Sequence, residues 1–279
     1  MTFIVRRGTV EQGVYVLYLT FTLEILVMLG FPVGLGLLLK RRTGVTWGLI
    51  MAGAFAFVAS QVVHLPLNWA LGLVSLPSGG GRGVALWPLP LMALVAGLSA
   101  GVCEEVARYL VLRFWQRDSR SWTQGVAFGV GHGGVEAIFT GVLVLITFSN
   151  MLILRGMGPE ALGLSGEVLE QVQTQSDAYW SIPWYLPLLG GLERISAITI
   201  QIALSLLVVR ALTHHHVGWL LAAIGAHALV DGVVVFLVGV GWAPVALEGV
   251  VLLFALGGLA LILASRPRPE SVSRETPSA

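Results

Sequence analysis

Three apolar segments of this sequence each carry a small cluster of charged residues and histidines at helical spacing. The clusters are Glu104, Glu105 and Arg108; His132 and Glu136; and His227 and Asp231. Residues four apart share one face of a helix, so each cluster would present its polar groups together. Ionisable groups are costly inside hydrocarbon and, within a membrane span, indicate a functional site. Carboxylates and imidazoles carry general acid–base chemistry and also bind zinc.

The composition excludes most soluble classes of protein. The chain has 279 residues, of which 56% are hydrophobic and only 11% charged, with a mean hydropathy of +0.85. Soluble domains carry roughly 25% charged residues, so we expect a polytopic membrane protein. The net charge of +1 argues against a nucleic-acid partner. The single cysteine, Cys103, excludes an internal disulfide and a CxxC metal site.

The hydrophobic pattern predicts an all-α bundle with about seven transmembrane helices, each needing about 20 mostly apolar residues. The predicted spans are 13–39, 44–72, 86–113, 121–154, 183–212, 216–240 and 242–264. Residues 1–264 would form a single transmembrane domain. The tail over 265–279 is charged and rich in proline and serine, so we expect it to be disordered.

Lysine and arginine in the loops predict the orientation, because cytoplasmic loops carry an excess of both. Most of them lie near 40–42, 113–120, 210 and 266–274, which would share one side of the membrane. This side is predicted to be cytoplasmic, with the N-terminus outside and the C-terminus inside. Arg6 and Arg7 oppose this assignment. The expected location is therefore the cell membrane, crossed several times.

The three polar clusters are predicted to meet at one depth. At about 1.5 Å per residue, Glu104, His132 and His227 lie roughly 13–17 Å from the cytoplasmic ends of their spans. Glu104 and Glu105 point about 100° apart on a helix, so they cannot share one role. Arg108 shares a face with Glu104 and could pair with it. The alternative is a buried ion-pair network that only packs helices together.

A second polar set lies further from the predicted cytoplasmic side. Its members are Gln61, His64 and Asn68 in one span and Glu193, Arg194, Ser196 and Gln201 in another. They could extend the same cavity or only form hydrogen bonds between helices.

Gly125, Gly129 and Gly133 have a small-residue spacing that lets a neighbouring helix approach closely. The loop over 155–181 could hold an amphipathic surface helix over 160–175. The loop itself could be a lid over the site or only a solvated connection.

The polar motifs resemble those of a known group of enzymes. Glu104-Glu105-x-x-Arg108, Phe128-x-x-x-His132 and His227-x-x-x-Asp231 are similar to the three motifs of the CAAX-protease and bacteriocin-processing superfamily of intramembrane proteases. Within it, GVGHGGVEAI, the stretch Gln61–Asn68 and the pair Glu193-Arg194 resemble the YhfC family of membrane peptidases. The resemblance covers roughly residues 60–235. It implies an intramembrane protease fold with a cavity open toward the cytoplasm.

The resemblance also implies a mechanism and a site. A glutamate, Glu104 or Glu105, would activate water, with Glu104 preferred; His132 and His227 would position the water and stabilise the oxyanion. Arg108 would set the charge of the carboxylate. Asp231 stands where the superfamily commonly has asparagine, which puts stabilisation by a neutral amide in doubt. Four further residues would support the site. They are Glu136, Glu193, Gln61 and His64.

The sequence leaves the cofactor and the function class open. We favour a metal-free, glutamic-type peptidase, although His132, Glu136, His227 and Asp231 could instead hold zinc. The expected partners are membrane lipid and a peptide or membrane-protein substrate. Buried acids and histidines also serve proton paths, so a proton-coupled transporter is the alternative. A third reading is an inactive scaffold that keeps the same fold.

Overall fold

The computed structural model describes residues 2–73 and 87–267 and is all-helical over these ranges, as predicted. The helices are α1 (Thr2–Thr43), α2 (Trp47–Ala70), α3 (Leu89–Leu110), α4 (Trp122–Met157), α5 (Gly166–Trp180), α6 (Leu186–Thr213), α7 (Gly218–Gly239) and α8 (Pro244–Ala264). A π-helical turn, Val111–Trp115, extends α3, and a 3-10 turn, Glu160–Leu162, precedes α5. Most of the predicted tail, 268–279, lies outside the described residues.

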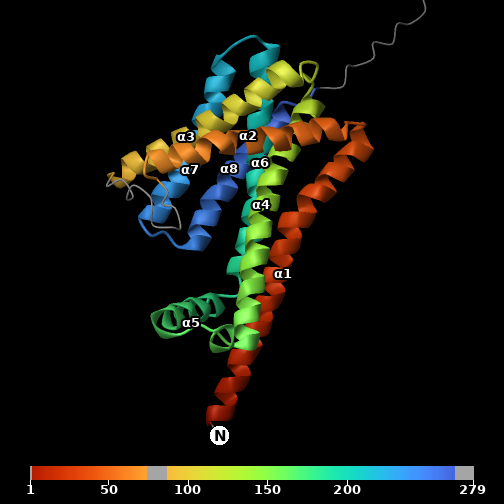
Figure 1. Ribbon diagram of the computed structural model, residues 1–279. Helices are drawn as coiled ribbons and strands as arrows, with labels where there is room; N and C mark the ends of the chain where they lie inside the picture. The colour runs from red at the N-terminus through yellow and green to blue at the C-terminus, as the bar shows by residue number, and fades with distance from the viewer. Residues whose placement is uncertain (1, 74–86, 268–279) are drawn as a thin grey trace, which may run out of the picture.

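Seven helices in the described ranges are long and apolar enough to cross a membrane, which confirms the predicted polytopic bundle. The exception among the α-helices is α5, which projects sideways from the bundle near the N-terminal end of the molecule (Figure 1). Aromatic contacts attach it to the long helices, since the ring of Tyr179 stacks on Phe21 with centroids 4.9 Å apart. The surface helix expected within the 155–181 loop is therefore present.

Glycines set how closely α4 packs on its neighbours. Gly125, Gly129 and Gly133 face α6, where an added Cβ at Gly129 would lie 2.5 Å from Ile202 Cα. On another face of α4, a Cβ at Gly131 would lie 1.8 Å from the carbonyl oxygen of Ile50 in α2. Only glycine permits such backbone contact, so the close approach predicted from the glycine spacing is confirmed. It places His132 between α2 and α6.

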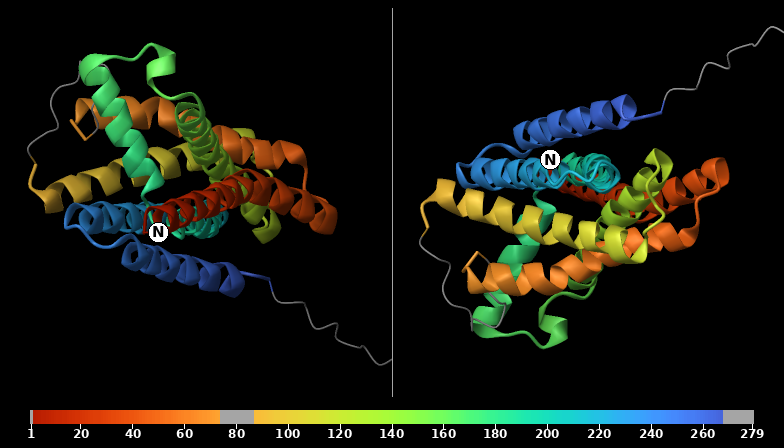
Figure 2. Two further views of the ribbon diagram at one scale, coloured as in Figure 1. Left: turned by 90° about the horizontal axis from the view of Figure 1, so that it is seen from below. Right: turned by 90° about the horizontal axis from the view of Figure 1, so that it is seen from above.

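Glycines also allow α3 to pack closely on α7, and this helix pair has the most extensive contact in the bundle. A Cβ at Gly97 would lie 2.2 Å from the carbonyl oxygen of Ala228, and one at Gly101 would lie 2.7 Å from that of Ile224. These glycines bring the glutamates of α3 against the histidine of α7. Seen from above and below, α2 and α8 lie on opposite sides of the bundle (Figure 2).

One end of the bundle is filled by an apolar core, and we call it the packed end. It is the end with the connections 44–46, 116–121 and 214–217. Its core is formed by fully or nearly fully buried side chains. They include Leu49, Ile50, Leu112, Ala127, Phe128, Leu204, Val208, Val209, Leu212 and Ala223. The other end, which holds the N-terminus, α5 and the 240–243 turn, is called the hollow end for the cavity described below.

Candidate active site

A cavity of about 310 Å³ lies between α2, α3, α4, α6, α7 and α8. Small and β-branched residues form its apolar wall and leave the space open. They are Ala96, Ala100, Ala197, Ile200, Val230, Val234, Val235 and Val251. Its polar lining combines the predicted clusters with the second polar set. The polar residues are His64, Asn68, Glu104, Glu136, Glu193, Arg194, Gln201, His227 and Asp231.

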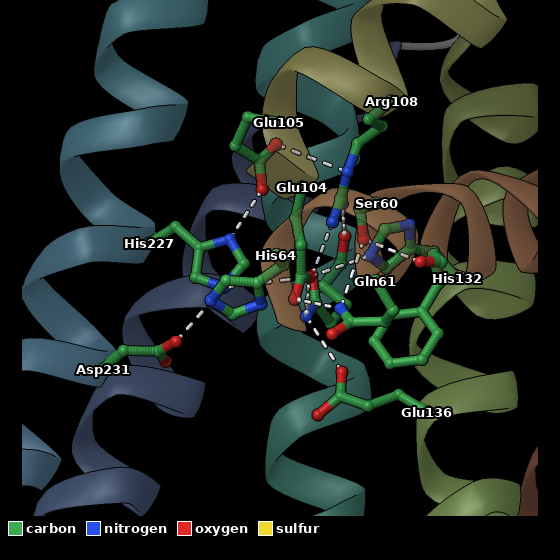
Figure 3. A network of polar contacts seen from close by, with 12 residues as sticks. Ser60, Gln61, His64, Glu104, Glu105, Arg108, His132, Glu136, His227 and Asp231 are labelled. Atoms are coloured by element: carbon green, nitrogen blue, oxygen red, sulfur yellow. Dashed lines mark hydrogen bonds and ion pairs between the residues drawn. The ribbon is translucent and has the colours of Figure 1, made fainter. Parts of the chain in front are cut away.

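Glu104 of α3 lies at the centre of the polar contacts (Figure 3). Gln61 Nε2 of α2 donates to Glu104 Oε1 at 3.1 Å. The other oxygen, Oε2, lies 3.1 Å from His132 Nε2 of α4 and 3.9 Å from His227 Nε2 of α7. Three helices, α2, α4 and α7, thus contribute side chains around the one carboxylate of α3.

Glu105 has different partners and is fully buried behind the cavity wall. Its Oε1 lies 2.8 Å from His227 Nδ1, and its Oε2 lies 3.3 Å from Arg108 Nε. With Nδ1 of His227 donating to Glu105, its Nε2 faces the carboxylates of Glu104 and Asp231. A protonated ring donates from both nitrogens, whereas a neutral ring leaves the lone pair at Nε2 for a metal ion. A carboxylate behind a histidine is the usual way to fix which ring nitrogen is free to act. The two adjacent glutamates therefore occupy different environments, as their angular separation predicted.

Arg108 does not pair with Glu104, contrary to our expectation from their shared helix face. Its guanidinium is fully buried and forms its ion pair with Glu105 instead. Nη1 donates to the carbonyl oxygen of Gln201 and to Ser205 Oγ, each at 2.7 Å, and Nη2 donates to Gln201 Oε1 at 2.6 Å. The planar fork of arginine suits several fixed acceptors better than one. Packing against α6 therefore decides where Arg108 points.

Gln201 of α6 connects the inner and outer parts of the cavity. Because Arg108 occupies its Oε1, its Nε2 is directed away, 3.0 Å from Glu136 Oε2 and 3.4 Å from Glu104 Oε2. Glu136 Oε1 accepts from Arg194 Nη1 at 3.1 Å, and Arg194 also pairs with Glu193. The chain of contacts runs from the deepest carboxylate toward the hollow end.

Of the other predicted residues, Asp231, His64 and Asn68 line the cavity, whereas Gln61, His132 and Ser196 lie outside its lining. Asp231 Oδ2 lies 3.6 Å from His227 Nε2. His64 Nε2 lies 2.9 Å from Asn68 Nδ2, and Ser99 Oγ donates to Asn68 Oδ1 at 2.7 Å. Most of the second polar set therefore extends the same cavity, which is one of the two readings left open by the sequence.

Nitrogen and oxygen donors suited to zinc gather at the inner end of the cavity. His132 Nε2, Glu104 Oε2, His227 Nε2 and Asp231 Oδ2 follow one another at 3.1, 3.9 and 3.6 Å. Tetrahedral zinc with bonds of about 2.0–2.2 Å places its donors roughly 3.3–3.6 Å apart. No three such side chains within 2–73 and 87–267 already surround one metal position. The donor types therefore suit zinc, but as placed in the described residues these side chains do not surround a common metal position.

Two polar residues of the site were not singled out in the sequence. Ser205 accepts from Arg108, and Ser99 holds Asn68. Ser205 lies four residues after Gln201, so a second polar residue on the same helix face was the available signal. Ser99 gave no such signal, because serine is common at packed helix contacts and its partner lies in α2.

The cavity runs toward the hollow end of the bundle, and which side of the membrane this is depends on the predicted orientation. From Glu104 and Gln201 the lining residues continue toward Asn68, Glu193 and Val235, all on the hollow-end side. The loops rich in lysine and arginine, expected on the cytoplasmic side, lie at the packed end. The apolar core fills that end, so the cavity runs away from these loops rather than toward them.

Comparison with known proteins places the chain in a family. A family model described as "YhfC intramembrane metalloprotease" matches residues 25–254. The "uncharacterized membrane protein YhfC" of Bacillus subtilis (strain 168) is 34% identical over 200 residues, covering 71% of this chain and 76% of that protein. No solved structure matches. The chain belongs to the YhfC intramembrane metalloprotease family, as its motifs suggested.

Proposed function

We propose that this protein hydrolyses a peptide bond at the inner end of the cavity, with Glu104 as the general base. One observation carries the proposal. The carboxylate of Glu104 lines the cavity and has two imidazole nitrogens, from His132 and His227, within 4 Å of one oxygen. A base with neighbouring donors, placed where a substrate can reach it, is the arrangement that amide hydrolysis requires.

Glu104 takes a proton from water, and the hydroxide attacks the scissile carbonyl carbon. The carbon–nitrogen bond then breaks, and the proton returns to the leaving amine. His132 and His227 orient the water and donate to the oxyanion as charge develops on it. Gln201, whose amide is held by Arg108, is a positioning residue that directs an N–H toward Glu104.

Glu105 acts through His227 and does not touch the substrate. Its carboxylate holds Nδ1 of that histidine and is itself held by Arg108. Residues that orient an active group typically contribute 10–100-fold to activity or metal affinity, which is about what we expect of Glu105.

The family description favours a metal over the metal-free mechanism that we preferred from the sequence. His132, His227 and Asp231 would hold zinc, since both oxygens of Glu136 are already engaged by Arg194 and Gln201. Zinc at this position would act as a Lewis acid and make water easier to deprotonate. Glu104 would then remain beside the ion as the base.

A transporter is supported less well than a hydrolase. A carrier must expose its site to both sides of the membrane in turn. Between Glu104 and the packed end lie side chains without measurable exposure, among them Leu112, Phe128 and Val208. The polar residues end at this core rather than continuing through it.

The test is cleavage of a membrane-anchored reporter peptide by the purified full-length protein in liposomes. Glu104→Gln keeps the shape of the side chain but removes the base, and should reduce cleavage by about 10³-fold or more. Glu105→Gln is the matched control on the neighbouring residue, with an expected loss of only about 10–100-fold. Undiminished cleavage by Glu104→Gln would refute the proposed base.

Zinc is tested by a measurement that needs no activity. We expect elemental analysis of the purified protein to find zinc, and His227→Ala and His132→Ala to lower its content. Glu136→Gln should leave the zinc content unchanged, because Glu136 is held by other partners. Equal zinc content in all of these variants, or none in the wild type, would contradict the proposed ligands and favour the metal-free mechanism.

A further inference from the structure

Among the described residues, the lining of the cavity continues toward one end of the bundle. Asn68 lies within one turn of the end of α2 at Ala70, and Val235 lies about one turn from the end of α7 at Gly239. In the other direction, Glu104 and Gln201 are about three turns from the packed end of their helices. The cavity lining therefore leads to the site from the hollow end, although Glu104 and Gln201 lie about four turns from that end of their helices.

Among the described residues, the packed end offers no comparable path to Glu104. A separate pocket of about 560 Å³ lies between 43–49 and 116–124, but its lining does not reach Glu104. The apolar core between α2, α4 and α6 lies beneath this pocket, and the connections of this end are tied down by hydrogen bonds. Arg120 donates to the carbonyl oxygens of Leu112, Gln116 and Ser119, while Ser121 and Gln124 form a capping box at the start of α4. Opening this end would require a tightly packed interior to separate.

The charges assign a side of the membrane to each end. Among the residues described with their side chains, every lysine and arginine except Arg108, Arg155 and Arg194 lies at the packed end. Several stack on aromatic rings there. The pairs are Lys40–Trp47, Arg210–Trp219 and Arg266–Trp122, at 5.5, 5.1 and 5.9 Å. Basic and aromatic residues together are typical of a cytoplasmic membrane interface.

The polar lining near the hollow end suits a polypeptide. A chain that enters a bundle in extended form must find partners for its backbone N–H and C=O groups, because lipid and aliphatic side chains provide none. Asn68 and His64 on α2, and Glu193 and Arg194 on α6, provide donors and acceptors along the way to Glu104. The alanines and valines between them leave room for the main chain.

We infer that the substrate is a polypeptide segment presented from the extracytoplasmic side of the membrane, which enters by the hollow end and reaches Glu104 through the cavity. This inference rests on the proposed hydrolysis for its substrate class but not for its direction of access. It reverses the cytoplasmic opening that the superfamily resemblance implied. The enzyme would thus act on exported or outward-facing segments rather than on cytoplasmic chain ends.

Direction of access is tested by labelling single cysteines with a membrane-impermeant maleimide. In a Cys103→Ala background, Val235→Cys lies in the cavity, and Val208→Cys is a matched control in the packed core. Two exposed positions report the sides, Glu170→Cys on α5 and Asp118→Cys between α3 and α4. We expect Val235→Cys and Glu170→Cys to be labelled in intact cells, Asp118→Cys only in inverted vesicles, and Val208→Cys in neither.

Two labelling results would overturn the inference. One is reaction of Val235→Cys only in inverted vesicles, and the other is no reaction of Val235→Cys from either side while both exposed positions react. A second experiment compares two reporters that share one membrane anchor. One has its cleavage site on the outer side of the anchor and the other on the inner side. Cleavage of the outer site, lost in Glu104→Gln, supports the inference, and cleavage of the inner site alone refutes it. Failure to cut either reporter counts against the hydrolysis, while the labels still decide the direction.

Discussion

The packed end and the hollow end are built from the same helices, but one is filled by an apolar core and the other is approached by a polar cavity. At the packed end, large side chains such as Leu112 and Phe128 interlock, and glycines on α4 bring its backbone into contact with α2 on one face and α6 on another. Around the cavity that runs toward the hollow end, alanines and valines replace them, and carboxylates, histidines and amides face the space that remains. Within lipid, helices associate through close packing and hydrogen bonds rather than through exclusion of water.

The comparison suggests a division of labour along the bundle. The buried apolar side chains of the packed end stabilise the bundle. The cavity can then remain unfilled and hold polar groups that are costly within the membrane. Arg108 lies at the boundary, fully buried, with Glu105 on one side and Gln201 and Ser205 on the other. The same kind of substitution should therefore have different consequences at the two ends and the largest consequence at the boundary.

Arg108→Met should have the largest effect. It removes the cation but keeps much of the volume, leaving Glu105 buried without its partner and Gln201 unanchored. Breaking a buried ion pair costs about 3–5 kcal/mol, and we expect this loss in the free energy of unfolding in detergent. Activity should fall as well. Arg108→Lys keeps the charge but not the planar fork, so it should recover only part of the lost free energy of unfolding. An Arg108→Met variant as stable as the wild type would contradict the structural role given to Arg108.

Gly131→Ala tests the packed end through its backbone contact. The new Cβ would lie 1.8 Å from the Ile50 carbonyl oxygen, so α2 and α4 must separate. We expect a loss of about 2–3 kcal/mol, near the upper part of the range for overpacking. Gly225→Ala on α7 is the control, because a Cβ there meets nothing within 4 Å. Equal unfolding temperatures for the two variants would contradict the packing argument.

Identical truncations compare the two ends directly. Val208→Ala, in the packed core, should cost about 2 kcal/mol, since two buried methyl groups and their contacts are lost. Val235→Ala, on the cavity wall, should cost less than about 0.5 kcal/mol because that side chain already borders open space. Chemical unfolding in one detergent measures both. A larger cost for Val235→Ala would reverse the assignment of the two ends.

Filling the cavity should have the smallest effect on stability and a clear one on activity. Val235→Phe adds bulk near the hollow end, where the cavity has room, so the free energy of unfolding should change by less than about 0.5 kcal/mol. Substrate access should be impeded, which raises KM for the reporter peptide more than it lowers kcat. Unchanged kinetics would show that substrate does not pass Val235.

Much of the fold and the list of polar residues was predictable from the sequence. Long apolar runs predicted the spans, because a bilayer needs helices of fixed length, and the glycine spacing on α4 predicted a close helix contact. The rough equality of depth for Glu104, His132 and His227 followed from counting residues along helices. The catalytic roles of these residues remain predictions.

Rotation, pairing and direction were decided only by the tertiary structure. Helical spacing allows Arg108 to pair with Glu104 (i, i+4) or with Glu105 (i, i+3), and the acceptors that α6 offers, Gln201 and Ser205, decide between them. Depth alone likewise could not show which end of the bundle is filled. That depends on how side-chain volumes from six helices add up at each level, a property of the assembled packing and not of any single segment.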